Sequence, residues 1–198
     1  MSATKQRDAV ARQAKTDLSA ALHSARNIAD PWFRAQALAH VLRYSEVQSQ
    51  WIADQAAAAA EECSDAYKQC AARAWEIAAL AERSDCKAAV ARLTSVLSKI
   101  GTVVPPSSRS EALSLLLHAA ARIGPGAAQE VAEIIVSISN NDSHWRCQRA
   151  TVGAIGVVQR LSSDVALALS EKVSDVKLRS KCDKIRAEGG TSPRAFFW

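Results

Sequence analysis

The chain has 198 residues and a formal net charge of +5 at pH 7, and 48% of its residues are hydrophobic but only 5% aromatic. This length fits one domain or a short array of repeats, and the scarcity of glycine and proline in the first hundred residues argues against a sheet. No stretch approaches the roughly 18 apolar residues that cross a bilayer. The first residues, MSATKQRDAV, form no apolar signal segment, so we expect a cytoplasmic protein without a membrane partner.

Apolar residues recur every three to four positions along most of the chain, as is typical of amphipathic helices. We predict about ten helices, at residues 3–28, 31–45, 46–62, 65–83, 85–100, 108–123, 127–139, 143–161, 163–173 and 175–187. Short links between them indicate antiparallel neighbours. The expected fold is therefore all-α, with five helix pairs in one repeat domain (residues 1–188) followed by a tail (189–198).

Helix starts and stops support these boundaries. Asp30 and Pro31 combine an N-cap residue with a proline at the first helical position. Ser108 and Glu111 have the spacing of a capping box, which predicts a helix start at residue 108. The double proline in GTVVPPSS indicates the one long loop of the chain.

The starts of the second helices align as an internal repeat, of which ADPWFRAQAL is the clearest copy. The first aligned column contains Asp30, Asp65, Pro105, Asp142 and Asp175, and four residues later stand Arg34, Gln69, Arg109, Arg146 and Arg179. The next column contains only small residues, namely Ala35, Cys70, Ser110, Cys147 and Ser180. Small side chains let two helices approach closely, so the repeat predicts stacked helix pairs.

The pattern DPxxRAxAL resembles the helix-pair units of HEAT-like repeats, and tetratricopeptide repeats have a similar period. Alanine-rich units of the form IADPxxRAxAL also resemble helical arrays attached to bacterial signalling and conflict proteins. The resemblance implies a right-handed α-solenoid with a scaffold or partner-binding role. Because such folds serve many functions, it implies no particular chemistry.

No catalytic or metal-binding pattern is evident, so we expect no cofactor and no enzymatic activity. The five cysteines show no CxxC spacing, and free thiols are expected. His144 and Cys147 lie in one helical turn, where a nucleophile and base could pair. The preferred interpretation of Cys147 is a small buried side chain at a helix seam.

Cationic side chains gather in the second helices, which usually line the concave face of a solenoid. We predict a basic groove that binds an acidic protein or peptide. Its expected contact residues are Arg34, Arg146, Arg149, Lys177 and Arg179. The alternative is a solvated face, with the aligned arginines bound to the aspartates of the turns.

Nucleic acid is the second candidate partner, because phosphates suit a basic groove and tryptophans can stack on bases. In the extreme case the chain would resemble a HEAT-like DNA glycosylase with a catalytic aspartate near tryptophan. Asp54, near Trp51, and Asp142, near Trp145, are the candidates. We interpret Asp142 instead as a helix cap.

The tail ends in the aromatic residues Phe196, Phe197 and Trp198. An exposed aromatic cluster at a terminus is unfavourable, so we predict an anchor. It would either cap the open end of the last repeat or insert into the groove of a neighbouring copy, which would give a homo-oligomer. A peptide released after Gly189 and Gly190 is a third interpretation.

Overall fold

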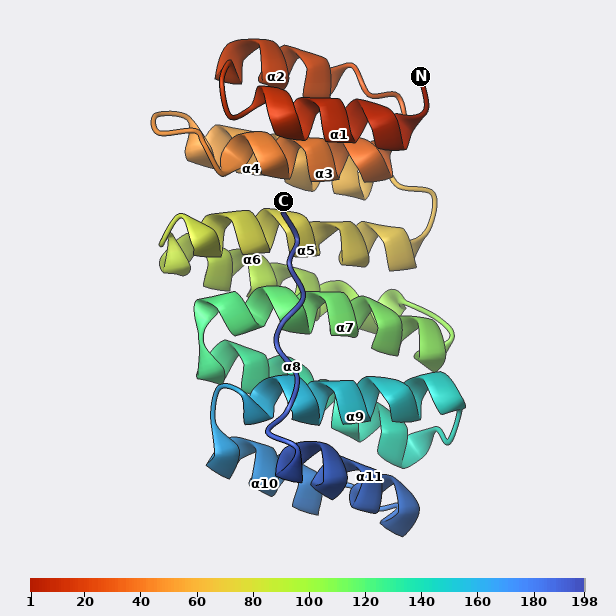
Figure 1. The fold of residues 1–198 in the computed structure, drawn as a ribbon. Helices are drawn as coiled ribbons and strands as arrows, with labels where there is room; N and C mark the ends of the chain where they lie inside the picture. The colour runs from red at the N-terminus through yellow and green to blue at the C-terminus, as the bar shows by residue number, and fades with distance from the viewer. Residues whose placement is uncertain (198) are drawn as a thin grey trace. The chain divides into compact units, whose positions relative to one another are not determined.

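The described part of the chain, residues 1–197, is helical throughout its regular elements. The computed structural model shows eleven α-helices and one 3₁₀ turn in these residues, and no strand (Figure 1). The elements are α1 (Ala3–Gln13), α2 (Leu18–Arg26), α3 (Pro31–Leu42), α4 (Ser49–Glu61), α5 (Ala66–Glu82), α6 (Cys86–Lys99), η1 (Ile100–Thr102), α7 (Pro106–Ile123), α8 (Pro125–Asn141), α9 (Trp145–Gln159), α10 (Ser163–Glu171) and α11 (Val176–Ala187). The prediction of an all-α protein is confirmed.

The predicted first helix, residues 3–28, is wrong, because the chain forms α1 and α2 there. Asp17 caps α2, and its carboxylate accepts a hydrogen bond from the N–H of Ala20 at 2.9 Å. Such a cap stabilises a helix start by about 1 kcal/mol. The apolar spacing continues across the turn, since Val10 and Ala21 are both buried. Periodicity alone therefore did not reveal the break.

The double proline lies at the beginning of a helix. Pro105 is extended, and α7 starts at Pro106, where the missing N–H would have no partner within the helix. The predicted capping box of Ser108 and Glu111 is therefore wrong. Ser108 is already inside α7, and the Glu111 carboxylate pairs with arginines of α9.

The helices form two compact units. The first contains Met1–Val96 together with residues 195–197, and the second contains Leu97–Arg194. In the first unit α3 contacts both α1 and α5, while α2 and α4 pack beside them (Figure 1). In the second unit α9 contacts both α7 and α11, and α8 and α10 pack beside them. Each unit thus places its odd-numbered helices in contact with one another.

Helix α5 packs on α3 and α4 within the first unit, and its residues 70–81 are buried. Many of them are alanines, whose small side chains allow neighbouring helices to approach closely. Two charged residues also lie inside: the Arg73 Nε is 2.5 Å from the Glu76 carboxylate. Burial raises the pKa of Glu76, and Arg73 opposes that shift. Removing one partner of such a buried pair would leave an uncompensated charge in the core and destabilise the fold.

The aligned column four residues after each helix start has a common structural role. In four of the five copies its side chain donates a hydrogen bond to the backbone carbonyl six residues earlier. These bonds join Arg34 to Ile28 at 3.0 Å, Gln69 to Cys63 at 3.0 Å, Arg109 to Val103 at 3.0 Å and Arg179 to Val173 at 2.9 Å. Each bond satisfies a carbonyl in the turn before the helix, which explains the polar residue in this column.

Candidate functional site

An exposed tryptophan with two arginines beside it lies at the start of α9. His144 caps this helix, and its Nδ1 accepts a hydrogen bond from the N–H of Arg146 at 3.2 Å. Trp145 follows in the first turn and is 56% exposed. The guanidinium carbons of Arg146 and Arg149 lie 5.5 and 4.9 Å from the centre of its ring system. The indole and the two cations thus form a single surface feature.

Helix α11 completes this feature. Lys181 and Leu178 of α11 line a small pocket of about 160 Å³ together with Trp145, Arg149 and residues of the next turn of α9. We call Trp145, Arg146, Arg149 and Lys181 the basic–aromatic cluster. The helices that supply it come from residues far apart in sequence, but they pack directly on each other in the second unit.

One carboxylate partly neutralises the basic–aromatic cluster. Glu111 of α7 has an Oε1 atom 3.6 Å from Arg146 Nε and 3.2 Å from Arg149 Nη2. The arginine side chains nevertheless remain 43% and 65% exposed. Exposed ion pairs of this kind contribute only about 0–1 kcal/mol, so a ligand carboxylate or phosphate can replace Glu111 at little cost.

The other predicted contact residues lie elsewhere. Arg34 belongs to the first unit, where it binds the Ile28 carbonyl and pairs with Glu62. Arg179 binds the Val173 carbonyl through two of its nitrogens, at 2.9 and 2.6 Å. Lys177 is exposed in the first turn of α11 but does not line the pocket of the cluster. Of the five predicted residues, the structure brings together Arg146 and Arg149.

In the sequence, Trp145 stands out only as the neighbour of Asp142, and Lys181 is not among the expected contact residues. The spacing of Trp145 and Arg149, four residues apart on one helix, is a local signal, because such residues face the same side. Lys181 carried no comparable signal, since its place beside Trp145 depends on the packing of α11 against α9. The cluster therefore combines a local pattern with a tertiary contact.

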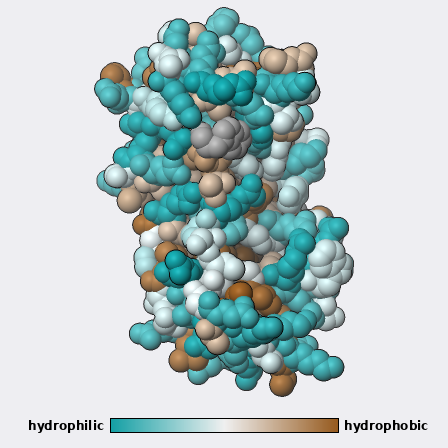
Figure 2. All heavy atoms as spheres, in the orientation of Figure 1, coloured by the Kyte–Doolittle hydropathy of each residue, from teal (hydrophilic) through white to brown (hydrophobic). Residues whose placement is uncertain are grey.

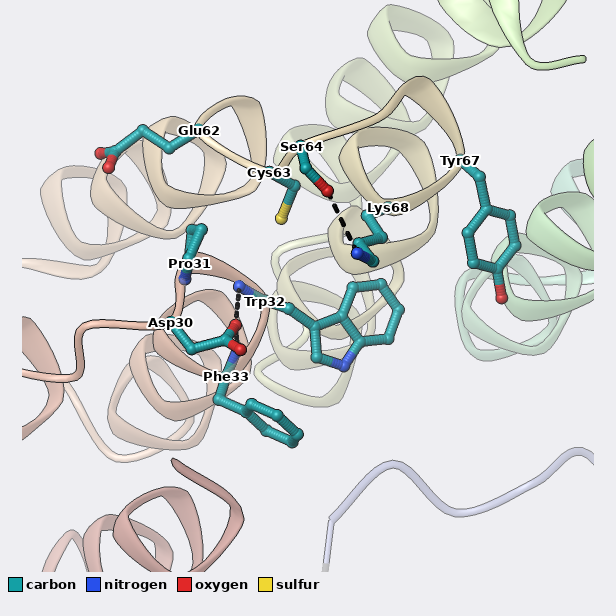
Figure 3. A pocket seen from close by; sticks show the side chains of 9 residues that line it. All are labelled: Asp30, Pro31, Trp32, Phe33, Glu62, Cys63, Ser64, Tyr67 and Lys68. Carbon is teal, nitrogen blue, oxygen red and sulfur yellow. Dashed lines mark hydrogen bonds between the residues drawn. The ribbon is translucent and has the colours of Figure 1, made fainter. Parts of the chain in front are cut away.

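A second pocket, of about 380 Å³, lies in the first unit at the starts of α3 and α5 (Figure 3). Its lining residues are Asp30, Pro31, Trp32, Phe33, Glu62, Cys63, Ser64, Tyr67 and Lys68. Asp30 is used as the cap of α3, and its carboxylate accepts from the N–H of Trp32 at 2.9 Å. The Lys68 Nζ donates to the Ser64 hydroxyl at 3.1 Å. Several of its polar groups are thus already bonded within the protein.

The thiol chemistry considered for Cys147 does not fit its surroundings. Cys147 is fully buried, and burial raises the pKa of its thiol. The nearby His144 uses its Nδ1 as a helix cap. Burial likewise raises the pKa of Cys182, to about 11. Within residues 1–197 no group of three or more His, Cys, Asp or Glu side chains could hold a metal ion.

Both aspartates considered as catalytic candidates have local partners. The Asp54 carboxylate accepts a hydrogen bond from Arg92. Asp142 is the residue that ends α8, and its carboxylate accepts from the N–H of His144 at 2.8 Å. The cap of α9 is thus His144 itself, with Asp142 supporting the turn before it.

The aromatic tail packs on its own chain. Phe196 and Phe197 are 1% and 8% exposed, and both belong to the first unit, not to the open end of the last helix pair. Trp198, the third predicted anchor residue, lies outside the described residues.

Figure 2 shows that the visible surface is mostly hydrophilic, with hydrophobic residues in small separate groups.

No known protein family, no curated protein and no solved structure matches this chain. None of the helices within residues 1–197 has both the length and the apolar character needed to cross a membrane.

Proposed function

We propose that the chain is a non-enzymatic interaction module that binds an acidic segment of a partner protein through the basic–aromatic cluster. The observation that carries this proposal is the exposed indole of Trp145 with two guanidinium groups within 5.5 Å of it. Tryptophan and arginine are the residues most enriched among those that dominate binding energy at protein interfaces. Lys181 adds a third cation at the edge of the same surface.

The proposed architecture is a right-handed α-solenoid of HEAT-like helix pairs. The contacts of odd-numbered helices with one another inside each unit support it. So does the shared hydrogen bond from the aligned column to the preceding turn. In such arrays the faces of successive helices form extended binding surfaces, which suits a partner segment that follows several helices.

A single-stranded nucleic acid is the second candidate ligand. An exposed indole flanked by arginines can stack on a base while the guanidinium groups bind phosphates. The same geometry of Trp145, Arg146 and Arg149 supports this alternative. The two candidate ligands differ in the groups that contact the indole. An acidic peptide would pack apolar side chains on it, whereas a nucleic acid would stack bases on it.

Fluorescence anisotropy with two labelled probes tests the proposal, using a short Glu-rich peptide that contains leucines and an oligothymidylate of similar length. We expect the peptide to bind more tightly, and we expect Arg149→Glu or Trp145→Ala to weaken it by roughly tenfold, about 1.4 kcal/mol. Arg160→Glu, an equal charge change at an exposed residue that ends the same helix, is the matched control.

Tighter binding of the oligothymidylate, with a steep loss of affinity as salt increases, would favour the nucleic-acid alternative. Equal losses for Arg149→Glu and Arg160→Glu would show that net charge, and not the basic–aromatic cluster, attracts the probes. Release of a base or cleavage of a strand would overturn the non-enzymatic assignment.

A further inference from the structure

The tail begins with backbone contacts inside the second unit. Gly189 and Gly190 have positive φ angles of 84° and 75°, which turn the chain after α11. The N–H of Thr191 then donates to the Gly156 carbonyl of α9 at 2.9 Å. Farther along, the N–H of Arg194 lies 3.3 Å from His118 Nδ1, and the Arg194 carbonyl accepts from Arg122 at 3.0 Å. The tail is thus held as an extended peptide by bonds to its main chain.

The next residues insert two aromatic rings into the first unit. The Phe196 ring centre is 5.2 Å from that of Trp75 with an interplanar angle of 81°, an edge-to-face contact. The Phe197 ring makes the same type of contact with His40, at 4.9 Å and 81°. The Arg43 guanidinium carbon lies 4.5 Å from the centre of the Phe197 ring. Each phenylalanine therefore has its own aromatic or cationic partners.

Two of these partners, Trp75 and Arg43, also have contacts that do not involve the tail. The Trp75 ring packs edge-to-face on Trp32 at 5.6 Å. The Arg43 Nε donates to the Glu82 carboxylate at 2.8 Å, which holds the guanidinium in place. We call Trp32, His40, Arg43 and Trp75 the aromatic seat. A site whose side chains are held by their own neighbours is preorganised. Binding of a ligand there costs less side-chain conformational entropy.

We propose that the aromatic seat is a peptide-binding site for an extended segment with two adjacent aromatic side chains. Phe196 and Phe197 are its resident occupants, and a partner segment of the same chemistry can displace them. Edge-to-face partners for two rings and a cation over one of them define this ligand class. The aromatic seat shares no residue with the basic–aromatic cluster, so this site goes beyond the proposed function.

The resident tail competes strongly because it is covalently attached. A tethered ligand acts at an effective concentration on the order of 1 mM. A free peptide with a dissociation constant of about 100 μM would therefore bind the intact chain roughly tenfold more weakly than a chain with a vacant seat. The difference in peptide affinity between a chain with an occupied seat and one with a vacant seat can therefore be measured.

The test uses the full-length Phe196→Ala/Phe197→Ala variant and a labelled peptide of residues 191–198, TSPRAFFW. We expect the variant to bind the peptide at least roughly tenfold more tightly than the wild type does. The peptide should also raise the melting temperature of the variant in a concentration-dependent way, because it binds only the folded chain. If the double variant does not fold by circular dichroism, Phe197→Ala takes its place in both measurements.

Two controls separate the aromatic seat from other surfaces. Adding Trp75→Ala to the variant should abolish binding, whereas adding Trp51→Ala should not, because Trp51 is exposed and packs on Arg26 instead. A peptide with both phenylalanines replaced by alanine should not bind. Equal affinity of wild type and variant, binding that survives Trp75→Ala, or no binding to the folded variant would each overturn the proposal. None of these results affects the Glu-rich peptide assay, so the two proposals fail independently.

Discussion

At the start of α7, the Arg109 side chain lies across the turn that precedes the helix. Its Nε donates to the Val103 carbonyl at 3.0 Å, and its Nη2 donates to the Gly101 carbonyl at 2.9 Å. One guanidinium thus satisfies two carbonyls, one in η1 and one in the turn between η1 and α7. The equivalent Arg34 and Arg179 likewise donate to the carbonyls of Ile28 and Val173, each in the turn before its helix. A row of arginines that looks like a binding surface in the sequence is therefore in large part a set of turn stabilisers.

Arg109→Ala should lower the free energy of unfolding by about 1–2 kcal/mol, because hydrogen bonds from a charged donor are lost. Urea denaturation followed by circular dichroism measures this change. Arg160→Ala, an exposed arginine in the same unit, should change stability by less than about 0.5 kcal/mol. If the two variants were equally stable, the aligned column would not owe its composition to the turns.

The buried imidazole of His40 makes stability depend on pH. The pKa of His40 is lowered to about 4, mainly by burial and in smaller part by the nearby cations of Arg43 and Arg7. In the unfolded chain the pKa is near 6.5. The unfolded state therefore binds more protons between pH 6.5 and 4, so the stabilisation is complete above about pH 6.5 and is lost as the pH falls toward 4.

We expect the wild type to lose up to about 3 kcal/mol of stability between pH 6.5 and 4 through His40. Denaturation curves at several pH values, compared with those of His40→Gln, measure this contribution. The variant should be less stable at pH 7 but have a flatter pH profile. The pKa of His118 is also lowered to about 4, mainly by burial, so His118→Gln provides the comparison for the second histidine. An unchanged slope in His40→Gln would contradict the assignment.

At the scale of a single helix, α9 contains two glycines with different surroundings. A Cβ added at Gly156 would lie 2.6 Å from the Thr191 hydroxyl and 3.2 Å from the Ile185 side chain, whereas nothing lies within 4 Å of one at Gly153. Gly156 therefore allows the tail to approach the helix, and its carbonyl accepts from the N–H of Thr191. Of the two glycines, only Gly156 lies where a side chain would meet a neighbouring segment.

The pair provides a matched test within one helix. Gly156→Ala should destabilise the second unit or release residues 190–192, because the added methyl group collides with the start of the tail. Gly153→Ala should instead stabilise the chain by about 0.5–1 kcal/mol, since alanine is a better helix former. Hydrogen exchange at Thr191, together with melting temperatures, distinguishes these effects. Stabilisation by both substitutions would contradict the described tail contact.

Residues near the two ends of the chain belong to one compact unit. Residues 195–197 belong to the same compact unit as Met1–Val96. The rings of Phe196 and Phe197 are buried there on α5 and α3. The stability of the first unit is therefore linked to residues at the opposite end of the sequence.

Phe196→Ala should increase hydrogen exchange in α3 and α5 and leave exchange in α10 unchanged. Removing a buried phenylalanine side chain costs about 3–5 kcal/mol, and this cost falls on the elements that contacted it. Exchange followed by mass spectrometry on peptic fragments measures the effect. Trp145→Ala, which removes a largely exposed ring in the second unit, is the control. Increased exchange spread evenly over all helices would contradict the assignment of the tail to the first unit.

The all-α class and most helix boundaries could be predicted from the amino-acid sequence. These depend on local signals, such as the caps Asp30, Asp65 and Asp175 and the three-to-four spacing of apolar residues. It also identified the aligned polar column, although not its role. The break before Asp17 was missed because apolar spacing continues through it.

The cationic residues that share a surface, and the position of the tail rings, could not be predicted in this way, because both depend on contacts between distant parts of the chain. Arg34 and Arg149 look alike in the sequence, but one guanidinium binds a turn carbonyl and the other packs beside an exposed indole. Lys181 joins Trp145, and Phe197 meets His40, through contacts between residues distant in the chain. Hydrophobic burial is non-directional, so the apolar tail sequence predicts that its rings will be buried but not which residues will cover them. The packing of helices that are distant in the sequence determines which residues those are.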